Sequence, residues 1–312
     1  MVYKLFWNSP RAATSLSVLA AATSLSVLAA ATTLSALAQE VNDGFRLNTA
    51  YILYGKSITH ISDTITPTGF PEGTPNNLGK TEKDSITLGL SASFSARLSG
   101  GIHVSGIRDE GSLEQRTNYL DNESKGFGYS AYLDYKLFGP ISLGVFAGQT
   151  SMSGTLSNTP ASGLTDRANF SSQSHNLGGY LATILPVDEH SAFRLSLAYN
   201  TSRSVTQYDE LALVFDAATK VKNEIDILNS SLVYMHKING DWRVHAGLTA
   251  GRVIRQVTPA GDTDFASILL TPAVGLIYRF NENYDVFANY GVTFWASTWW
   301  TSTYTLGLSY KF

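Results

Sequence analysis

Seven basic side chains stand at similar places in a series of alternating segments, each within a few residues of one end of its segment. They are Arg46, Arg97, Lys136, Arg194, Arg243, Arg279 and Lys311. On the face assignment described below they point into one interior, where they would form a basic collar at one mouth. A collar of cationic groups around a watery passage attracts small anionic solutes. Ordinary water-facing charges, some of them paired with Asp134 and Asp285, explain the pattern equally well.

Signals for catalysis or metal binding are poor. The six histidines are His60, His103, His175, His190, His236 and His245, and none stands in a recognised catalytic pairing. The acidic residues Asp209, Glu210, Asp216, Asp262 and Asp264 follow no calcium-loop spacing. We therefore expect no enzyme, no metal site and no cofactor. A net charge of −3 gives no basic footprint for nucleic acid.

The last nine residues show the pattern that positions these side chains. Residues 304–312 read Y-T-L-G-L-S-Y-K-F, so that apolar and small or polar side chains alternate strictly. A long apolar edge strand invites aggregation in a soluble protein. In a membrane barrel the apolar face meets lipid, and the last strand pairs with the first. The ending therefore predicts an all-β transmembrane antiparallel barrel.

The rest of the chain repeats this pattern and gives twelve expected strands. Their ranges are 44–54, 86–98, 101–108, 127–138, 141–149, 174–185, 192–202, 224–238, 242–254, 267–280, 284–294 and 304–312. Most of them have the roughly ten residues that a tilted membrane strand needs. In the first strand, the alternation places Phe45, Leu47, Thr49, Tyr51 and Leu53 on one face.

The connections alternate between tight turns and longer polar loops. Ser99-Gly100, Gly139-Pro140 and Asn239-Gly240 are turn signals, whereas 58–80 and 109–125 read as loops. Short periplasmic turns and long extracellular loops are typical of outer-membrane barrels. The inward positions are mostly small or polar, and a twelve-strand barrel is wider than side chains of this kind can fill. Water, a plug or a helix should occupy the lumen.

Residues 1–38 have the composition of a secretory signal. Basic residues precede an apolar run, and Ala36-Leu37-Ala38 forms a small-x-small site. We expect cleavage after Ala38, leaving 39–312 as the barrel domain; a retained membrane anchor is the rival interpretation. The mature chain would then lie in the outer membrane of a Gram-negative cell.

The strand number, the length and the Y-K-F ending resemble the translocator barrel of autotransporters. The resemblance implies that Tyr310 and Phe312 belong to an ending that is read by the barrel-assembly machinery. It departs from the family in one respect. Residues 39–43 reach at most ~17 Å, too short to thread the ~25 Å apolar band, so we expect no passenger in the usual place.

These observations predict an outer-membrane barrel of autotransporter type that acts as a surface-exposed membrane protein or as a simple passive pore. The alternatives are a diffusion channel (porin) for small anionic solutes, or an adhesin that works through the loops 58–80 and 109–125. The expected partners are outer-membrane lipid and lipopolysaccharide, the assembly machinery and small anionic solutes.

Overall fold

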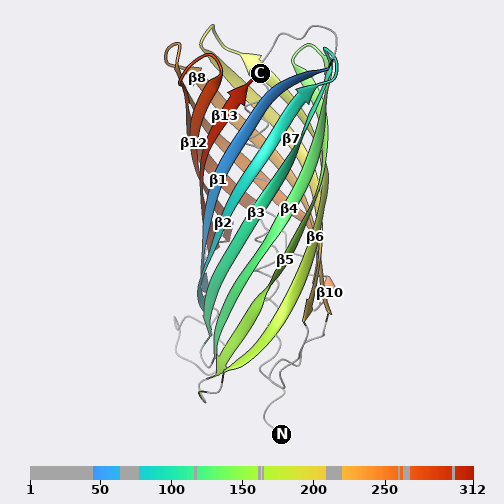
Figure 1. The fold of residues 1–312 in the computed structure, drawn as a ribbon, viewed down its shortest axis with the longest axis vertical. Helices are drawn as coiled ribbons and strands as arrows, with labels where there is room; N and C mark the ends of the chain where they lie inside the picture. Colours follow the sequence, from blue (N-terminus) through green and yellow to red (C-terminus); the bar gives the residue numbers. More distant parts are fainter. Residues whose placement is uncertain are drawn as a thin grey trace.

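Twelve long antiparallel strands form a closed barrel in the computed structural model (Figure 1). The structure describes residues 45–63, 77–115, 118–160, 163, 165–208, 220–258, 261–262, 268–296 and 299–312. The expected signal segment and its cleavage site lie outside these residues. No helix in the described ranges is long and apolar enough to cross a membrane.

The strands follow one another around the barrel in chain order. The first six are β1 (Arg46–Asp63), β2 (Asn77–Ser93), β3 (Leu98–Gln115), β4 (Asn118–Phe138), β5 (Ile141–Pro160) and β6 (Asp166–Pro186). The others are β7 (Ser191–Tyr208), β8 (Lys220–Lys237), β9 (Trp242–Thr258), β11 (Ile268–Arg279), β12 (Tyr284–Ala296) and β13 (Trp299–Lys311). A two-residue strand, β10 (Gly261–Asp262), pairs with β9.

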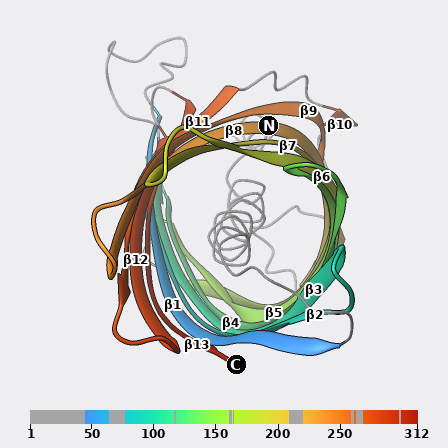
Figure 2. The same cartoon turned by 90° about the horizontal axis from the view of Figure 1, so that it is seen from above.

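The barrel closes where the first and last strands pair. Thr49 of β1 lies opposite Lys311 of β13, and the ladder continues to Ile61 opposite Trp299. Figure 2 shows the strands as a complete ring around the barrel axis. Closure leaves no open sheet edge among the long strands, which is the condition for a sheet to cross lipid with its backbone hydrogen bonds satisfied.

Most strands are longer than the sequence predicted. Strands β3 and β4 stay paired from Leu98 opposite Tyr135 to Gln115 opposite Asn118. The segment 109–125, expected to be a loop, is therefore strand at each of its described residues, and β1 and β2 likewise extend into 58–80. Beyond the lipid both faces of a strand meet water, so the apolar alternation ends although the backbone ladder continues.

The first tight turn falls earlier than expected. Residues 94–97 turn the chain, and Ser99 and Gly100 already belong to β3. Ser95 Oγ accepts hydrogen bonds from the backbone N–H groups of Arg97 and Leu98, at 3.2 and 3.0 Å. The Asn239-Gly240 prediction is confirmed, because Asn239 Oδ1 accepts bonds from the N–H groups of Asp241 and Trp242.

A bulge in β1 changes which side chains face the lumen. The register with β2 shifts between Leu47 and Thr49. After the bulge, Ile52 points outward with 45% exposure, whereas Leu53 is only 3% exposed on the inner side. The prediction that Phe45, Leu47, Thr49, Tyr51 and Leu53 share one face of β1 is therefore wrong. An extra residue on one strand reverses the inside and outside of all that follow.

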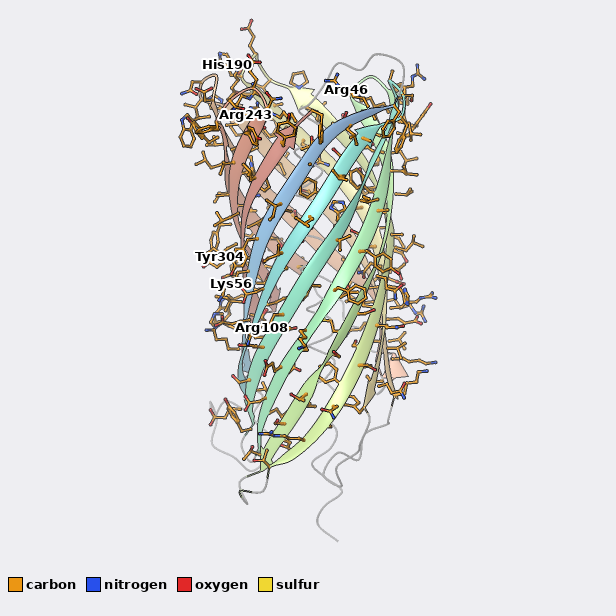
Figure 3. All side chains as sticks on the ribbon, in the orientation of Figure 1. Arg46, Lys56, Arg108, His190, Arg243 and Tyr304 are labelled. Atoms are coloured by element: carbon orange, nitrogen blue, oxygen red, sulfur yellow. The ribbon has the colours of Figure 1, made fainter. Side chains whose placement is uncertain are left out.

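The outer wall carries a broad apolar belt (Figure 3). Its outward side chains include Ile86, Leu88, Leu90, Ile102, Val104, Leu177, Leu197, Leu248, Val274 and Leu306. In a soluble protein such a continuous apolar surface would cause aggregation. In a membrane it is the surface that contacts the lipid tails.

The inner wall is more aromatic than the sequence predicted. Tyr132, Phe146 and Tyr180 form one inward cluster with Ala182. Some inward rings lie flat against a glycine of the neighbouring strand, and a Cβ added at Gly307 would collide with the ring of Phe287. Glycine is needed there because the ring occupies the space that a side chain would take.

Candidate functional site at the turn end of the lumen

The candidate site lies at the end of the barrel that holds the tight turns and both described chain ends, Phe45 and Phe312. We call this the turn end. Figure 3 shows Arg46, Arg243 and His190 at this end and Arg108 toward the opposite end. The structure divides five of the seven predicted basic residues between two clusters on the inner wall, each organised around one aspartate. The other two lie at the rim.

The first group, which we call the Asp285 cluster, consists of Arg243, Arg279, Asp285 and Lys311. Asp285 opens β12 and lies opposite Arg279 of β11 and Ser309 of β13. Lys311 Nζ lies 2.5 Å from Asp285 Oδ2, and Arg279 Nε lies 3.6 Å from Oδ1. Asp285 is only 1% exposed. Two cations from neighbouring strands therefore share one buried carboxylate.

Arg243 brings a third positive charge to this cluster. It lies opposite Ile277, two residues before Arg279 on the same face of β11. It interacts electrostatically with both Arg279 and Asp285. In the described residues, neither Arg279 Nε nor Asp285 Oδ1 has a hydrogen-bond partner. Three basic groups around one acid leave a formal excess of two positive charges on this part of the wall.

The second group, which we call the Asp134 cluster, joins β4, β6 and β7. Tyr180 Oη donates a hydrogen bond to Asp134 Oδ2 at 3.0 Å. Lys136 and Arg194 both interact electrostatically with Asp134. Arg194 points inward because its neighbours Phe193 and Leu195 are exposed on the outer wall. This cluster has a formal excess of one positive charge.

The two remaining basic residues lie at the rim. Arg97 is exposed in the turn 94–97. The prediction that it lines the barrel wall is therefore wrong, because the chain turns at 94–97 and not at Ser99-Gly100, where the sequence placed the turn. Arg46 is exposed at the start of β1, and its Nη2 donates a hydrogen bond to the Phe312 carbonyl at 3.4 Å. Arg46 thus contacts the chain end across the closing seam.

The aromatic chain end forms an outward cluster at the same end of the barrel. The rings of Tyr284 and Tyr310 have centroids 5.0 Å apart, and Phe312 packs edge-on against Tyr310 at the same distance. The Phe312 N–H donates to the Asn48 carbonyl at 3.2 Å. The predicted terminal residues therefore sit where the last strand joins the first.

The lumen also holds polar contacts that the sequence did not predict. Tyr51 Oη is hydrogen-bonded to His103 Nδ1 across β1 and β3. Simple alternation of the sequence placed Tyr51 with the outward residues, because it does not take account of the bulge in β1. A cavity of about 120 Å³ is lined by His103 and by small polar residues that include Ser57, Ser85, Thr87 and Ser105.

The chemistry of this inner wall is electrostatic. No group of three or more His, Cys, Asp or Glu side chains within the described ranges is placed to hold a metal ion. The Asp285 and Asp134 clusters together carry a formal excess of three positive charges at one end of the lumen. Fixed positive charge on a concave wall raises the local concentration of anions.

The fold is similar to that of autotransporter translocators. The translocator domain of the autotransporter NalP from Neisseria meningitidis aligns with a TM-score of 0.70 and 12% identity, covering 95% of this chain and 98% of that one. The transport unit of the autotransporter AIDA-I from Escherichia coli aligns with a TM-score of 0.61 and 10% identity, covering 88% and 94%. This chain therefore has the fold of an autotransporter-type outer-membrane barrel.

An outer-membrane channel from Pseudomonas putida F1 is also similar, with a TM-score of 0.55 and 13% identity, covering 88% of this chain and 97% of that one. No protein-family model and no curated protein sequence matches the chain. The neighbours are translocator and channel barrels.

Proposed function

We propose that this protein is an outer-membrane barrel whose lumen passes small anionic solutes, with the turn end in the periplasm. The fold and the outward apolar belt support the membrane location. The observation that carries the solute preference is the Asp285 cluster, where Arg243, Arg279 and Lys311 surround a single buried carboxylate. A lumen wall that only had to be polar would not need more positive than negative side chains.

The two clusters act on a solute through their field. Each aspartate neutralises part of the charge near it and holds the basic side chains in place. The remaining positive charge faces the lumen from β4, β7, β9, β11 and β13. An anion entering from the turn end is therefore favoured, and a cation is disfavoured, most strongly at low ionic strength where screening is weak.

Conductance in a planar bilayer tests this proposal. The parent protein should conduct, and its reversal potential in a salt gradient should show anion preference. The triple variant Arg194→Gln, Arg243→Gln, Arg279→Gln should remain folded and lose most of that preference. The effect should grow as the salt concentration falls.

A matched control removes three positive charges from the outer wall instead. Arg203, Arg252 and Arg255 lie on β7 and β9 and point outward. Their replacement by Gln should leave the reversal potential unchanged. A parent protein that does not conduct, or a lumen variant that keeps its anion preference, would contradict the proposed pore.

Transport of a polypeptide is the second candidate function. It is favoured by the alignment over nearly the whole chain with the NalP translocator domain. A reporter peptide fused before Gln39 distinguishes the two. Its appearance on the cell surface, with loss of the signal after external protease treatment, would support translocation. A reporter that stays in the periplasm, together with measurable conductance, would support the pore.

A further inference from the structure

The outer wall beyond the apolar belt carries charges that the proposed pore does not use. On β7, β8 and β9 the outward side chains change from apolar to charged as the strands leave the belt toward the end opposite the turns. The outward basic residues there are Arg203, Lys220, Lys222, Arg252 and Arg255, and the outward acids are Glu224 and Asp226. We call this the β7–β9 patch. Its formal net charge is +3.

The register shows that the patch is continuous and begins at the edge of the belt. Arg252 lies opposite Leu228, an outward residue of the belt that is 38% exposed. The next outward residue of β8, Asp226, lies opposite Arg255, and Glu224 lies opposite Arg203. Lys222 and Lys220 continue the same face outward. Basic groups thus begin at the level where lipid tails end.

The basic groups of the patch are only loosely paired. Arg203 Nε lies 3.9 Å from Glu224 Oε1, and Arg255 Nη1 lies 3.5 Å from Oε2 of the same carboxylate. Both arginine side chains are more than half exposed, at 67% and 54%. Their guanidinium groups are therefore available to an external anion, and arginine binds phosphate with two parallel hydrogen bonds.

The opposite side of the barrel differs at the same level. Outward side chains of β1–β4 include four basic residues, Lys56, Lys80, Arg108 and Lys125, and six acids, Glu82, Asp84, Glu110, Glu114, Asp121 and Glu123. Three of the four basic residues are closely ion-paired: Lys56 Nζ lies 2.7 Å from Glu82 Oε2, Lys80 pairs with Oε1 of the same carboxylate, and Arg108 pairs with Glu110. This side is self-neutralised, with a slight acidic excess.

We propose that the β7–β9 patch binds the phosphate groups of lipopolysaccharide in the outer leaflet. The inference rests on the proposed orientation, which places the end opposite the turns outside the cell. Phosphates of the lipid headgroup lie just above the tails, at the height where Arg203, Arg252 and Arg255 leave the belt. An excess of positive charge on one side only would bind the lipid there and leave the β1–β4 side free.

Retention of lipid by the purified barrel tests this inference. The protein in neutral detergent is incubated with lipopolysaccharide or with its dephosphorylated form, and bound lipid is measured by native mass spectrometry. The variant Arg203→Gln, Arg252→Gln, Arg255→Gln should retain phosphorylated lipopolysaccharide at least about tenfold less than the parent. The matched variant Lys56→Gln, Lys80→Gln, Arg108→Gln, on the opposite side, should retain it as the parent does.

Three results would overturn the inference. They are equal loss in both variants, equal retention of the dephosphorylated lipid, and displacement of lipopolysaccharide by an equal amount of phosphatidylglycerol, which would show a general anionic-lipid surface. The pore and the lipid site can fail separately. Neither triple variant used here alters the lumen, and the conductance variant leaves the outer wall unchanged.

Discussion

At the scale of single residues, the two clusters of the inner wall contain more basic side chains than acidic ones. Asp285 is buried and ion-paired with Lys311 and Arg279, while Arg243 lies near enough to interact with both Arg279 and the carboxylate. Removing one partner of a buried ion pair costs more than the pair itself contributes, because the remaining charges are left uncompensated. The carboxylate is therefore the residue on which the cluster depends.

Replacement of Asp285 by Asn should lower the free energy of unfolding by about 3 kcal/mol. The three basic groups would then repel one another with no acid between them. Urea unfolding, followed by the heat-modifiable band on a gel, measures the change. Glu282→Gln removes one exposed acid from the turn 280–283 and should change stability by less than about 0.5 kcal/mol. Equal stability of the Asp285→Asn variant and the parent would show that the cluster is fully solvated.

At the scale of the strands, close packing of rings on glycine shapes the inner wall. The Phe287 ring on β12 covers Gly307 on β13, and Phe287 is itself almost completely buried. These two strands are adjacent to the closing seam, so their spacing affects the pairing of β13 with β1. A side chain at Gly307 would have to displace the ring or the strand.

Gly307→Ala should lower stability by about 1–3 kcal/mol, the usual cost of overpacking. The urea midpoint of the folded barrel measures it. Gly106→Ala is the matched control, because no atom lies within 4 Å of a Cβ added there. A Gly307 variant as stable as the Gly106 variant would mean that the Phe287 ring moves aside without cost.

At the scale of the whole molecule, the barrel is completed by its last residue. Phe312 donates its N–H to Asn48, accepts a hydrogen bond from Arg46 on its carbonyl, and packs on Tyr310. All three contacts lie at the seam between β1 and β13. Closure of the barrel therefore involves the terminal residue directly.

Phe312→Ala should reduce the amount of folded barrel recovered in outer-membrane fractions, while the barrels that do fold keep the parent conductance. We propose that the chain end is read during assembly, whereas the lumen charges lie on the inner wall. Phe280→Ala, which removes another exposed aromatic residue at the turn end, should leave the yield unchanged. An unchanged yield for Phe312→Ala would show that the terminal ring is not part of the assembly signal.

The sequence alone was sufficient for the fold class, because lipid imposes a strict alternation that remains visible in the segments crossing the membrane. Tyr304 to Phe312 shows it plainly, and the structure places Leu306 and Leu308 outside and Thr305 and Ser309 inside. Inward orientation of Arg194, Arg243 and Arg279 followed from the same rule. These predictions needed only local periodicity and the requirement that a sheet in lipid be closed.

Only the tertiary structure decided the register, the strand ends and the grouping of charges. The bulge beside Asn48 exchanges the inward and outward positions in the rest of β1, and no residue type in the sequence indicates it. Beyond the belt, the strands continue without alternation, because water solvates both of their faces. Arg279 and Lys311 meet at Asp285 because of which residues of β11, β12 and β13 lie opposite one another. This register is a property of the backbone pairing, and no single segment of the sequence contains it.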